Sequence, residues 1–229
     1  MLDDPPLLTV RRNFPRPSPK QIDAFRGMPT AQVVDAMDGR GALDRSIKPQ
    51  VRPGTALVGP ALTAFAYPAD NLALLGCLDV LQPGDIVVCA TDSYRETALT
   101  GDLLAGMLRN AGAVALVTDG AIRDQDGVEA AGLPVWHGGV TPNSPARFGP
   151  GSVGLPVTCG GVPVASGDLI VADRDGVVVV PHARIDEVAE RVALIREAEA
   201  ATEAQVKAGM VRPPWLDAVF GTDKVREID

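Results

Sequence analysis

The sequence has few histidines, lysines and cysteines, and each shortage excludes a class of site. Its 229 residues include two histidines, so a zinc ion held by three histidines is excluded. The four lysines lie in polar segments, whereas a Schiff-base lysine needs a desolvated setting that lowers its pKa. The three cysteines form no Cys-x-x-Cys pair and lie in apolar runs, which predicts reduced, buried thiols and a cytoplasmic protein.

Long hydrophobic runs and excess positive charge are also missing. No apolar run approaches the roughly 18–20 residues that a membrane span needs. The start of the chain is acidic and then proline-rich, unlike the basic and apolar start of a secretory signal. The net charge of −8 would repel a polyanion. We therefore expect neither a membrane nor a nucleic-acid partner.

The order of apolar patterns predicts a mixed α/β domain. Prolines in residues 1–19 predict a non-helical arm, and the first helix is predicted to begin at Thr30. The run over 55–67 is β-like, with an interruption at Gly59-Pro60. Residues 168–180 predict a β-hairpin, and 183–207 predict a long amphipathic helix. Regular βαβα alternation is absent, which argues against a simple doubly wound sheet.

One glycine motif suggests a nucleotide site that its context rules out. Residues 149–154 match Gly-x-Gly-x-x-Gly, the fingerprint of dinucleotide-binding loops. Pro150 breaks the loop geometry, and a strand-like stretch follows where a helix must begin. We therefore predict no dinucleotide cofactor.

The segment from Thr100 to Leu104 predicts an anion pocket at the start of a helix. Gly101 allows a ligand to approach the backbone closely, and the first-turn amides suit a carboxylate. Asp102 lies beside that pocket, where it can relay protons. Taken alone, Asp102 is more simply explained as a favourable first-turn acid.

A strand ending in Asp119-Gly120 leads to Arg123 and Asp124. Arginine grips a carboxylate or an enolate oxygen in a forked geometry. Asp124 can anchor a metal ion through one oxygen while waters fill most of the shell. Since histidines are so few, the metal is expected to be Mg²⁺ or Mn²⁺. The alternative is an ordinary surface ion pair in a turn.

The stretches GDLLAGMLRNAG and AVALVTDGAIRD, over 101–124, resemble the signature of the RraA-like / 4-hydroxy-4-methyl-2-oxoglutarate aldolase family. Supporting stretches are TALVGPALTAF, LQPGDIVV and DRDGVVVVP. The resemblance covers roughly residues 20–209. It implies a single domain of the RraA-like ββα swivelling type with a C-terminal helix, between the arm at 1–19 and a tail at 210–229.

The resemblance also implies a site between the subunits of a homotrimer or homohexamer. Arg123 would bind the 2-keto acid substrate, and Asp124 would hold Mg²⁺ or Mn²⁺. The main-chain amides of Leu103 and Leu104 would take the pyruvyl carboxylate. Asp102 would orient a catalytic water.

The family further supplies an acid from a neighbouring subunit's C-terminal helix. Glu199, three residues before Thr202, is the best match, with Glu197 and Glu203 as competitors. A solvated helix face explains Glu199 equally well. Glu203 stands where the aldolases often carry arginine, and the ending MVRPPWLDAVF also differs from theirs, so the substrate stays open.

The predicted reaction is the metal-dependent, class II cleavage of a 4-hydroxy-2-oxo acid to pyruvate plus a keto acid or an aldehyde. Oxaloacetate decarboxylation passes through the same enolate and is expected as a side activity. Two alternatives remain: a non-catalytic RraA-type regulator that binds ribonuclease E, and another keto-acid or sugar-acid lyase on the same scaffold. The intact Arg123–Asp124 pair favours an enzyme.

Overall fold

A mixed sheet with a parallel centre organises the first part of the chain. The computed structural model describes residues 4–52 and 54–228, so residues 1–3 of the predicted arm and residue 229 of the predicted tail lie outside it. The sheet follows the order β1 (Leu8–Val10), β10 (Gly151–Val153), β3 (Leu57–Ala66), β4 (Ile86–Ala90), β6 (Ala115–Thr118), β8 (Val135–His137) and β2 (Lys48–Gln50). Strands β3, β4, β6 and β8 run parallel and are almost wholly buried, as strands covered on both faces must be.

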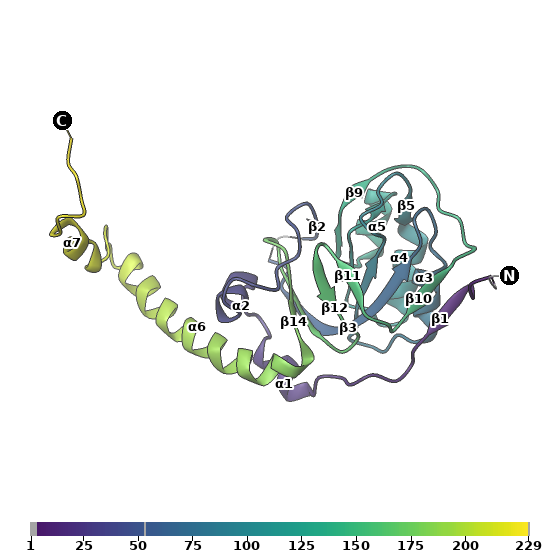
Figure 1. Cartoon of the computed structure of the whole chain (residues 1–229), viewed down its shortest axis with the longest axis horizontal. Helices are drawn as coiled ribbons and strands as arrows, with labels where there is room; N and C mark the ends of the chain where they lie inside the picture. The colour runs from purple at the N-terminus through teal and green to yellow at the C-terminus, as the bar shows by residue number, and fades with distance from the viewer. Residues whose placement is uncertain (1–3, 53, 229) are drawn as a thin grey trace. The chain divides into compact units, whose positions relative to one another are not determined.

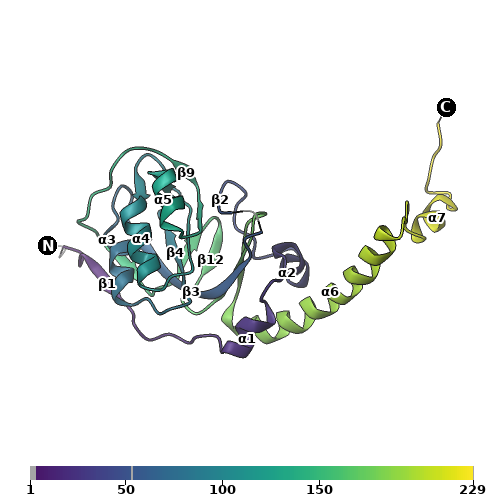
Figure 2. The same cartoon turned by 180° about the vertical axis from the view of Figure 1, so that it is seen from behind.

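Helices cover one face of this sheet (Figure 2). They are α3 (Leu72–Gly76), followed by the 3₁₀ turn η1 (Cys77–Asp79), then α4 (Asp102–Asn110) and α5 (Gln125–Ala131). Alternate strand residues such as Leu62 and Leu116 share one apolar core with Leu74, Leu108 and Val128 of the helices. This core holds α4 and α5 against the sheet.

The other face is covered by β-structure (Figure 1). A hairpin of β11 (Val157–Cys159) and β12 (Val162–Val164) and a second hairpin of β13 (Leu169–Ala172) and β14 (Val177–Val180) supply it. Their side chains pack with Ile86, Val117 and Trp136 in a second core. The resulting ββα layering confirms the predicted fold class, and β13–β14 confirms the predicted hairpin.

Strand β3 corrects the predicted interruption at Gly59-Pro60. The strand is continuous, but its neighbours change at this point: residues 57–60 pair with β13, and residues 61–65 pair with β4. A proline removes one hydrogen-bond donor without ending a strand. Directly after Pro60, the Ala61 amide donates to the Asp168 carbonyl (2.8 Å), so the pairing of the strand continues.

The N-terminal segment corrects a second prediction. A short helix, α1 (Pro19–Ala24), precedes the predicted first helix, so the first helix does not begin at Thr30. Ser18 caps α1 through a reciprocal capping box with Gln21. This local helix signal was missed because the many prolines of the arm predicted non-helical structure, although proline is tolerated in the first turn of a helix. Helix α2 (Thr30–Ala36) begins where predicted.

The three cysteines are free and buried, as their apolar surroundings predicted. Burial raises the pKa of Cys77 to about 12, and it also raises the pKa values of Cys89 and Cys159. Thiols in this state stay protonated at neutral pH and are poor nucleophiles.

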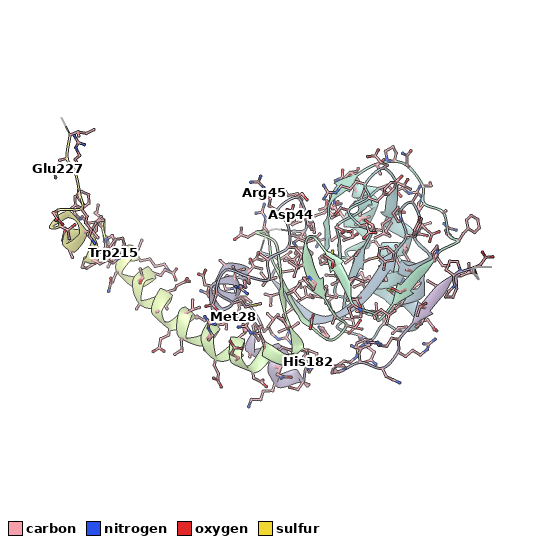
Figure 3. All side chains as sticks on the ribbon, in the orientation of Figure 1. Met28, Asp44, Arg45, His182, Trp215 and Glu227 are labelled. Carbon is pink, nitrogen blue, oxygen red and sulfur yellow. The ribbon has the colours of Figure 1, made fainter. Side chains whose placement is uncertain are left out.

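After the turn η2 (His182–Arg184), helix α6 (Ile185–Lys207) begins on the first unit of the chain, Met1–Val192, where Ile185, Val188 and Val192 are buried. The second unit, Ala193–Asp229, holds the rest of α6 and helix α7 (Trp215–Phe220). In this unit the side chain of Trp215 is exposed (Figure 3). Of the helices in the described part of the chain, none is both long and apolar enough to cross a bilayer.

Candidate active site

Three short parallel strands bring the predicted site segments together. Strands β5 (Ala98–Thr100), β7 (Ala121–Ile122) and β9 (Gly139–Val140) follow β4, β6 and β8 along the chain and pair side by side. The Arg123 amide donates to the Thr100 carbonyl, and the Thr141 amide donates to the Ile122 carbonyl, both at 3.0 Å. Because parallel strands end at one edge, the starts of α4 and α5 meet there. Ligands of parallel sheets bind at this kind of edge.

Gly101 lies directly beneath the side chains of Arg123 and Asp124. Its backbone is extended (φ −139°), a conformation that any residue adopts. Glycine is therefore required here only because there is no room for a side chain. A Cβ atom at this position would lie 2.4 Å from Asp124 Oδ2 and 3.1 Å from Arg123 Cγ. The glycine thus permits the close approach that the sequence predicted, although here the approaching groups are the chain's own.

The guanidinium of Arg123 is held from two sides. Its Nε atom lies 3.1 Å from Asp124 Oδ2, and its Nη1 donates to the hydroxyl of Ser144. The side chains of Arg123 and Asp124 are 35% and 44% exposed, so both remain open to a ligand. Ser144 was not singled out from the sequence, because it lies 21 residues beyond Arg123 in an irregular segment.

Asp124 adopts a left-handed backbone conformation (φ 54°, ψ 46°) at the N-terminus of α5. Few residues other than glycine adopt this conformation, aspartate and asparagine more readily than most, and such residues cluster at functional sites. The Asp124 carboxylate makes no capping bond to the α5 amides. It is directed instead toward Gly101 and Arg123, in the centre of the site.

Asp102 opens α4 and lies against α5. A Cβ atom on Gly127 would come within 2.7 Å of Asp102 Cβ and 3.0 Å of its Oδ2. The Asp102 Oδ1 atom accepts a bond of 2.7 Å from the Leu103 amide. Leu103 is 74% exposed and Leu104 is buried. A ligand carboxylate at these first-turn amides would therefore displace the Asp102 contact at Leu103.

A hollow of about 420 Å³ opens beside the pair. Its lining comes from the start of α5 with the two residues before it and from the end of β9 with the residues after it, and includes Arg123, Asp124, Asp126, Val140, Thr141 and Pro142. This volume suits a small organic acid.

The residues present suit a hard divalent cation bound mainly by water. Within residues 4–52 and 54–228, no three His, Cys, Asp or Glu side chains cluster as a metal site. Asp124 offers one exposed carboxylate that is not used as a helix cap. Mg²⁺ and Mn²⁺ accept such a site, since Mg²⁺ in particular keeps several waters and takes one or two carboxylates together with substrate oxygens.

Asp119 is buried and supports the site through its hydrogen bonds. From the sequence it was recognised only as the residue at the end of a strand. Its Oδ1 accepts the Thr91 amide at 2.8 Å, and its Oδ2 accepts the Ser93 amide at 3.1 Å. Asp92 and Ser93 both have positive φ angles, and these bonds hold that strained turn. The polar loop after β4 is thereby fixed to the strand that leads to Arg123.

Two further segments that are rich in Asp or Gly have structural roles. Asp173 accepts the amides of Thr30 (2.9 Å) and Asp175 (2.8 Å), as a hairpin-turn residue does. Residues 149–154 contain strand β10 and no helix start, consistent with the rejection of a dinucleotide loop. Glu199 lies on α6 in the second unit, and its reach into a neighbouring site stays a prediction.

Comparison with known proteins places these motifs in a family. Residues 30–179 match the family described as RraA-like: Aldolase/RraA. The chain belongs to this family. A relative from Halalkalibacterium halodurans, named "Putative 4-hydroxy-4-methyl-2-oxoglutarate aldolase", is 36% identical over 187 residues, which cover 82% of this chain and 87% of the relative.

Solved structures agree on the RraA-like fold. An uncharacterized protein from Pseudomonas syringae pv. tomato superposes with a TM-score of 0.76 at 26% identity, covering 87% of this chain and 97% of that one. Streptomyces coelicolor RraAS2, described as an unusual member of the RNase ES inhibitor RraA protein family, superposes with a TM-score of 0.74 at 28% identity. The match covers 83% of this chain and 100% of RraAS2.

Proposed function

We propose that this RraA-like protein is a divalent-metal-dependent aldolase that cleaves a 4-hydroxy-2-oxo acid to release pyruvate. The aldolase name of the H. halodurans relative, similar over most of both chains, supports a carbon–carbon lyase. The observation that carries the proposal is the packing of Arg123 and Asp124 over Gly101, beside the start of α4 and a hollow of suitable size.

Each residue has a distinct task in this mechanism. The first-turn amides of Leu103 and Leu104 bind the substrate carboxylate together with Arg123, and Arg123 also faces the 2-keto oxygen. Asp124 would hold Mg²⁺ or Mn²⁺, which when bound polarises the keto group and stabilises negative charge. Asp102, beside the first turns of both helices, positions the water that removes the C4 hydroxyl proton.

The electrons and protons balance without a further reactant. Loss of the C4 hydroxyl proton makes C4 a carbonyl carbon as the C3–C4 bond breaks. The bonding pair becomes pyruvate enolate, which takes a proton at C3 to give pyruvate. The charge develops only along the reaction, so a preplaced guanidinium favours the transition state over the ground state. Oxaloacetate reaches the same enolate by losing carbon dioxide.

The test is Mg²⁺-dependent pyruvate release from a panel of 4-hydroxy-2-oxo acids. Removal of a group that stabilises transition-state charge costs about 100- to 1,000-fold in rate. We expect a loss of that size for Asp124→Ala. Asp23→Ala, which removes an exposed surface partner of Arg26, is the matched control. Parent-like activity of Asp124→Ala would contradict the assignment of the metal ligand, and trapping of a lysine adduct by borohydride would contradict the metal route.

A second candidate function comes from the similarity to S. coelicolor RraAS2, whose description names a ribonuclease inhibitor family. Under this alternative the chain binds a ribonuclease E-type enzyme without catalysis. Purified ribonuclease E, assayed with and without this chain, separates the two. Inhibition that persists in Asp124→Ala, together with no pyruvate release from the parent, would favour the regulator.

We also propose a homotrimer or homohexamer in which Glu199 of one subunit serves the site of another. Leu103 and Met107, one turn apart on the outer side of α4, are exposed apolar residues next to the site, and their exposure supports an interface there. Light scattering of the purified protein measures the subunit number.

A further inference from the structure

The hollow beside Arg123 is lined by two different surfaces. Asp124 and Asp126 contribute acidic groups from the start of α5, and Val140 and Pro142 contribute apolar groups from the end of β9 and the segment after it. Val140 is 50% exposed, so it presents apolar surface to the hollow. A substrate whose carboxylate meets Arg123 and the metal on Asp124 therefore extends into a hollow that is lined by the acid Asp126 and by apolar groups.

Arg123 is the one basic side chain that lines this hollow in the described part of the chain. Its Nη1 already donates to Ser144, and its Nε faces Asp124 at 3.1 Å. A forked contact with one carboxylate uses two N–H groups of a guanidinium. The remaining N–H groups face the 2-keto oxygen and the first carboxylate, which the α4 amides also bind, and this leaves little for a second carboxylate.

Asp126 adds a further negative charge where the distal part of a substrate would lie. It is exposed in the first turn of α5 and belongs to the lining of the hollow. A second carboxylate on the substrate would be repelled by Asp126 or would lose water against Val140 and Pro142. An uncharged group suffers neither penalty.

We propose that this site selects 4-hydroxy-2-oxo acids with an uncharged substituent on C4, so that the second product is a neutral aldehyde or ketone. The proposal rests on the lyase function above and specifies its substrate class. It differs from the dicarboxylate in the name of the H. halodurans relative. Asp126 is the residue that disfavours a second carboxylate.

A binding experiment tests the proposal without any reaction. The ligands 2-oxopentanoate and 2-oxoglutarate have the same length, lack a C4 hydroxyl, and differ by a terminal methyl against a carboxylate. Titration calorimetry with Mg²⁺ is expected to give at least fivefold tighter binding of 2-oxopentanoate. Equal or tighter binding of 2-oxoglutarate would overturn the proposal.

Two variants of α5 show whether Asp126 is responsible. Asp126→Asn is expected to narrow the ratio of the two dissociation constants severalfold. Glu129→Gln removes an exposed acid of the same helix that lines a different cavity, and it is expected to keep the parent ratio. An unchanged ratio in Asp126→Asn would contradict the role given to this residue.

A cleavage assay separates this inference from the proposed function. The parent is given 4-hydroxy-2-oxopentanoate and, separately, 4-hydroxy-4-methyl-2-oxoglutarate, and pyruvate is measured. We expect kcat/KM to be at least tenfold higher for the first substrate. The reverse preference would overturn the substrate class and leave the lyase intact, whereas no pyruvate from either would overturn the lyase function itself.

Discussion

Gly101 and Asp124 lie so close that a methyl group on the glycine would be 2.4 Å from the Asp124 carboxylate. The two residues are 23 positions apart and come from different β-strand ends, β5 and β7. Their contact explains why the helix start and the Arg-Asp pair act as one site. A larger residue at position 101 must therefore displace Asp124.

Replacement of Gly101 by alanine should therefore move Asp124 and Arg123 apart from the start of α4. Overpacking of this kind costs about 1–3 kcal/mol of unfolding free energy. We expect a roughly 100-fold loss of kcat, because misplacement by about 1 Å is enough to cause such a loss. Gly106→Ala on the same helix meets no atom within 4 Å and serves as the control. Full activity in Gly101→Ala would show that the close contact is dispensable.

Arg123 should not be replaceable by lysine. The guanidinium reaches Asp124 and Ser144 at once, whereas an ammonium cannot form the fork. We expect Arg123→Lys to lower kcat/KM about 100-fold. Ser144→Ala, which leaves the charge and removes one support, should raise KM about three- to tenfold with a smaller effect on kcat. Steady-state kinetics measures both, and an equal loss of kcat/KM in the two variants would mean that the Ser144 support matters as much as the guanidinium fork.

The sequence predicted the parts of the site that have local signals. A glycine followed by a first-turn acid marked the start of α4, and Asp-Gly marked the end of β6. The β5–β7–β9 sheet had no such signal, because strands of two or three residues carry no periodicity. Ser144 and the partners of Asp119 were missed for the same reason: their contacts span 21 to 28 residues and depend on the assembled sheet.

Asp119 should be essential for stability. Its carboxylate accepts the amides and the hydroxyls of buried Thr91 and of Ser93, which is exposed. Asp119→Ala leaves the buried Thr91 amide without its acceptor, at about 1–3 kcal/mol, and also releases the turn that the Ser93 amide helps to hold. We expect a loss of about 3 kcal/mol in urea unfolding, against less than about 0.5 kcal/mol for exposed Asp223→Ala. A loss below 1 kcal/mol would mean that water replaces the carboxylate.

His137 should make the protein less stable in mild acid. Burial lowers its pKa below the ordinary value, and its Nδ1 atom is buried with no hydrogen-bond partner among the described residues. The unfolded chain binds a proton near pH 6.5 while the folded chain resists it, so stability is full above that pH and falls as the pH drops below it. Urea unfolding at pH 7 and pH 5 should show a smaller decrease in His137→Gln than in the parent. His182→Gln is the control, and identical decreases in the parent and His137→Gln would contradict the role of His137.

The shared site can be tested by mixing two inactive variants. If Glu199 serves a neighbouring subunit, Asp124→Ala and Glu199→Gln remove groups that belong to the same site but to different chains. Mixed oligomers then contain some sites with both residues intact, so activity should return after the two proteins are unfolded together and refolded. A homotrimer formed at random from equal amounts is expected to recover roughly a quarter of the parent activity per site, since each intact site needs one chain of each kind in the correct order.

Refolding either variant alone is the control. Loss of activity in both variants without recovery on mixing would place Glu199 and Asp124 in the site of one chain, and parent-like activity of Glu199→Gln would remove Glu199 from the mechanism.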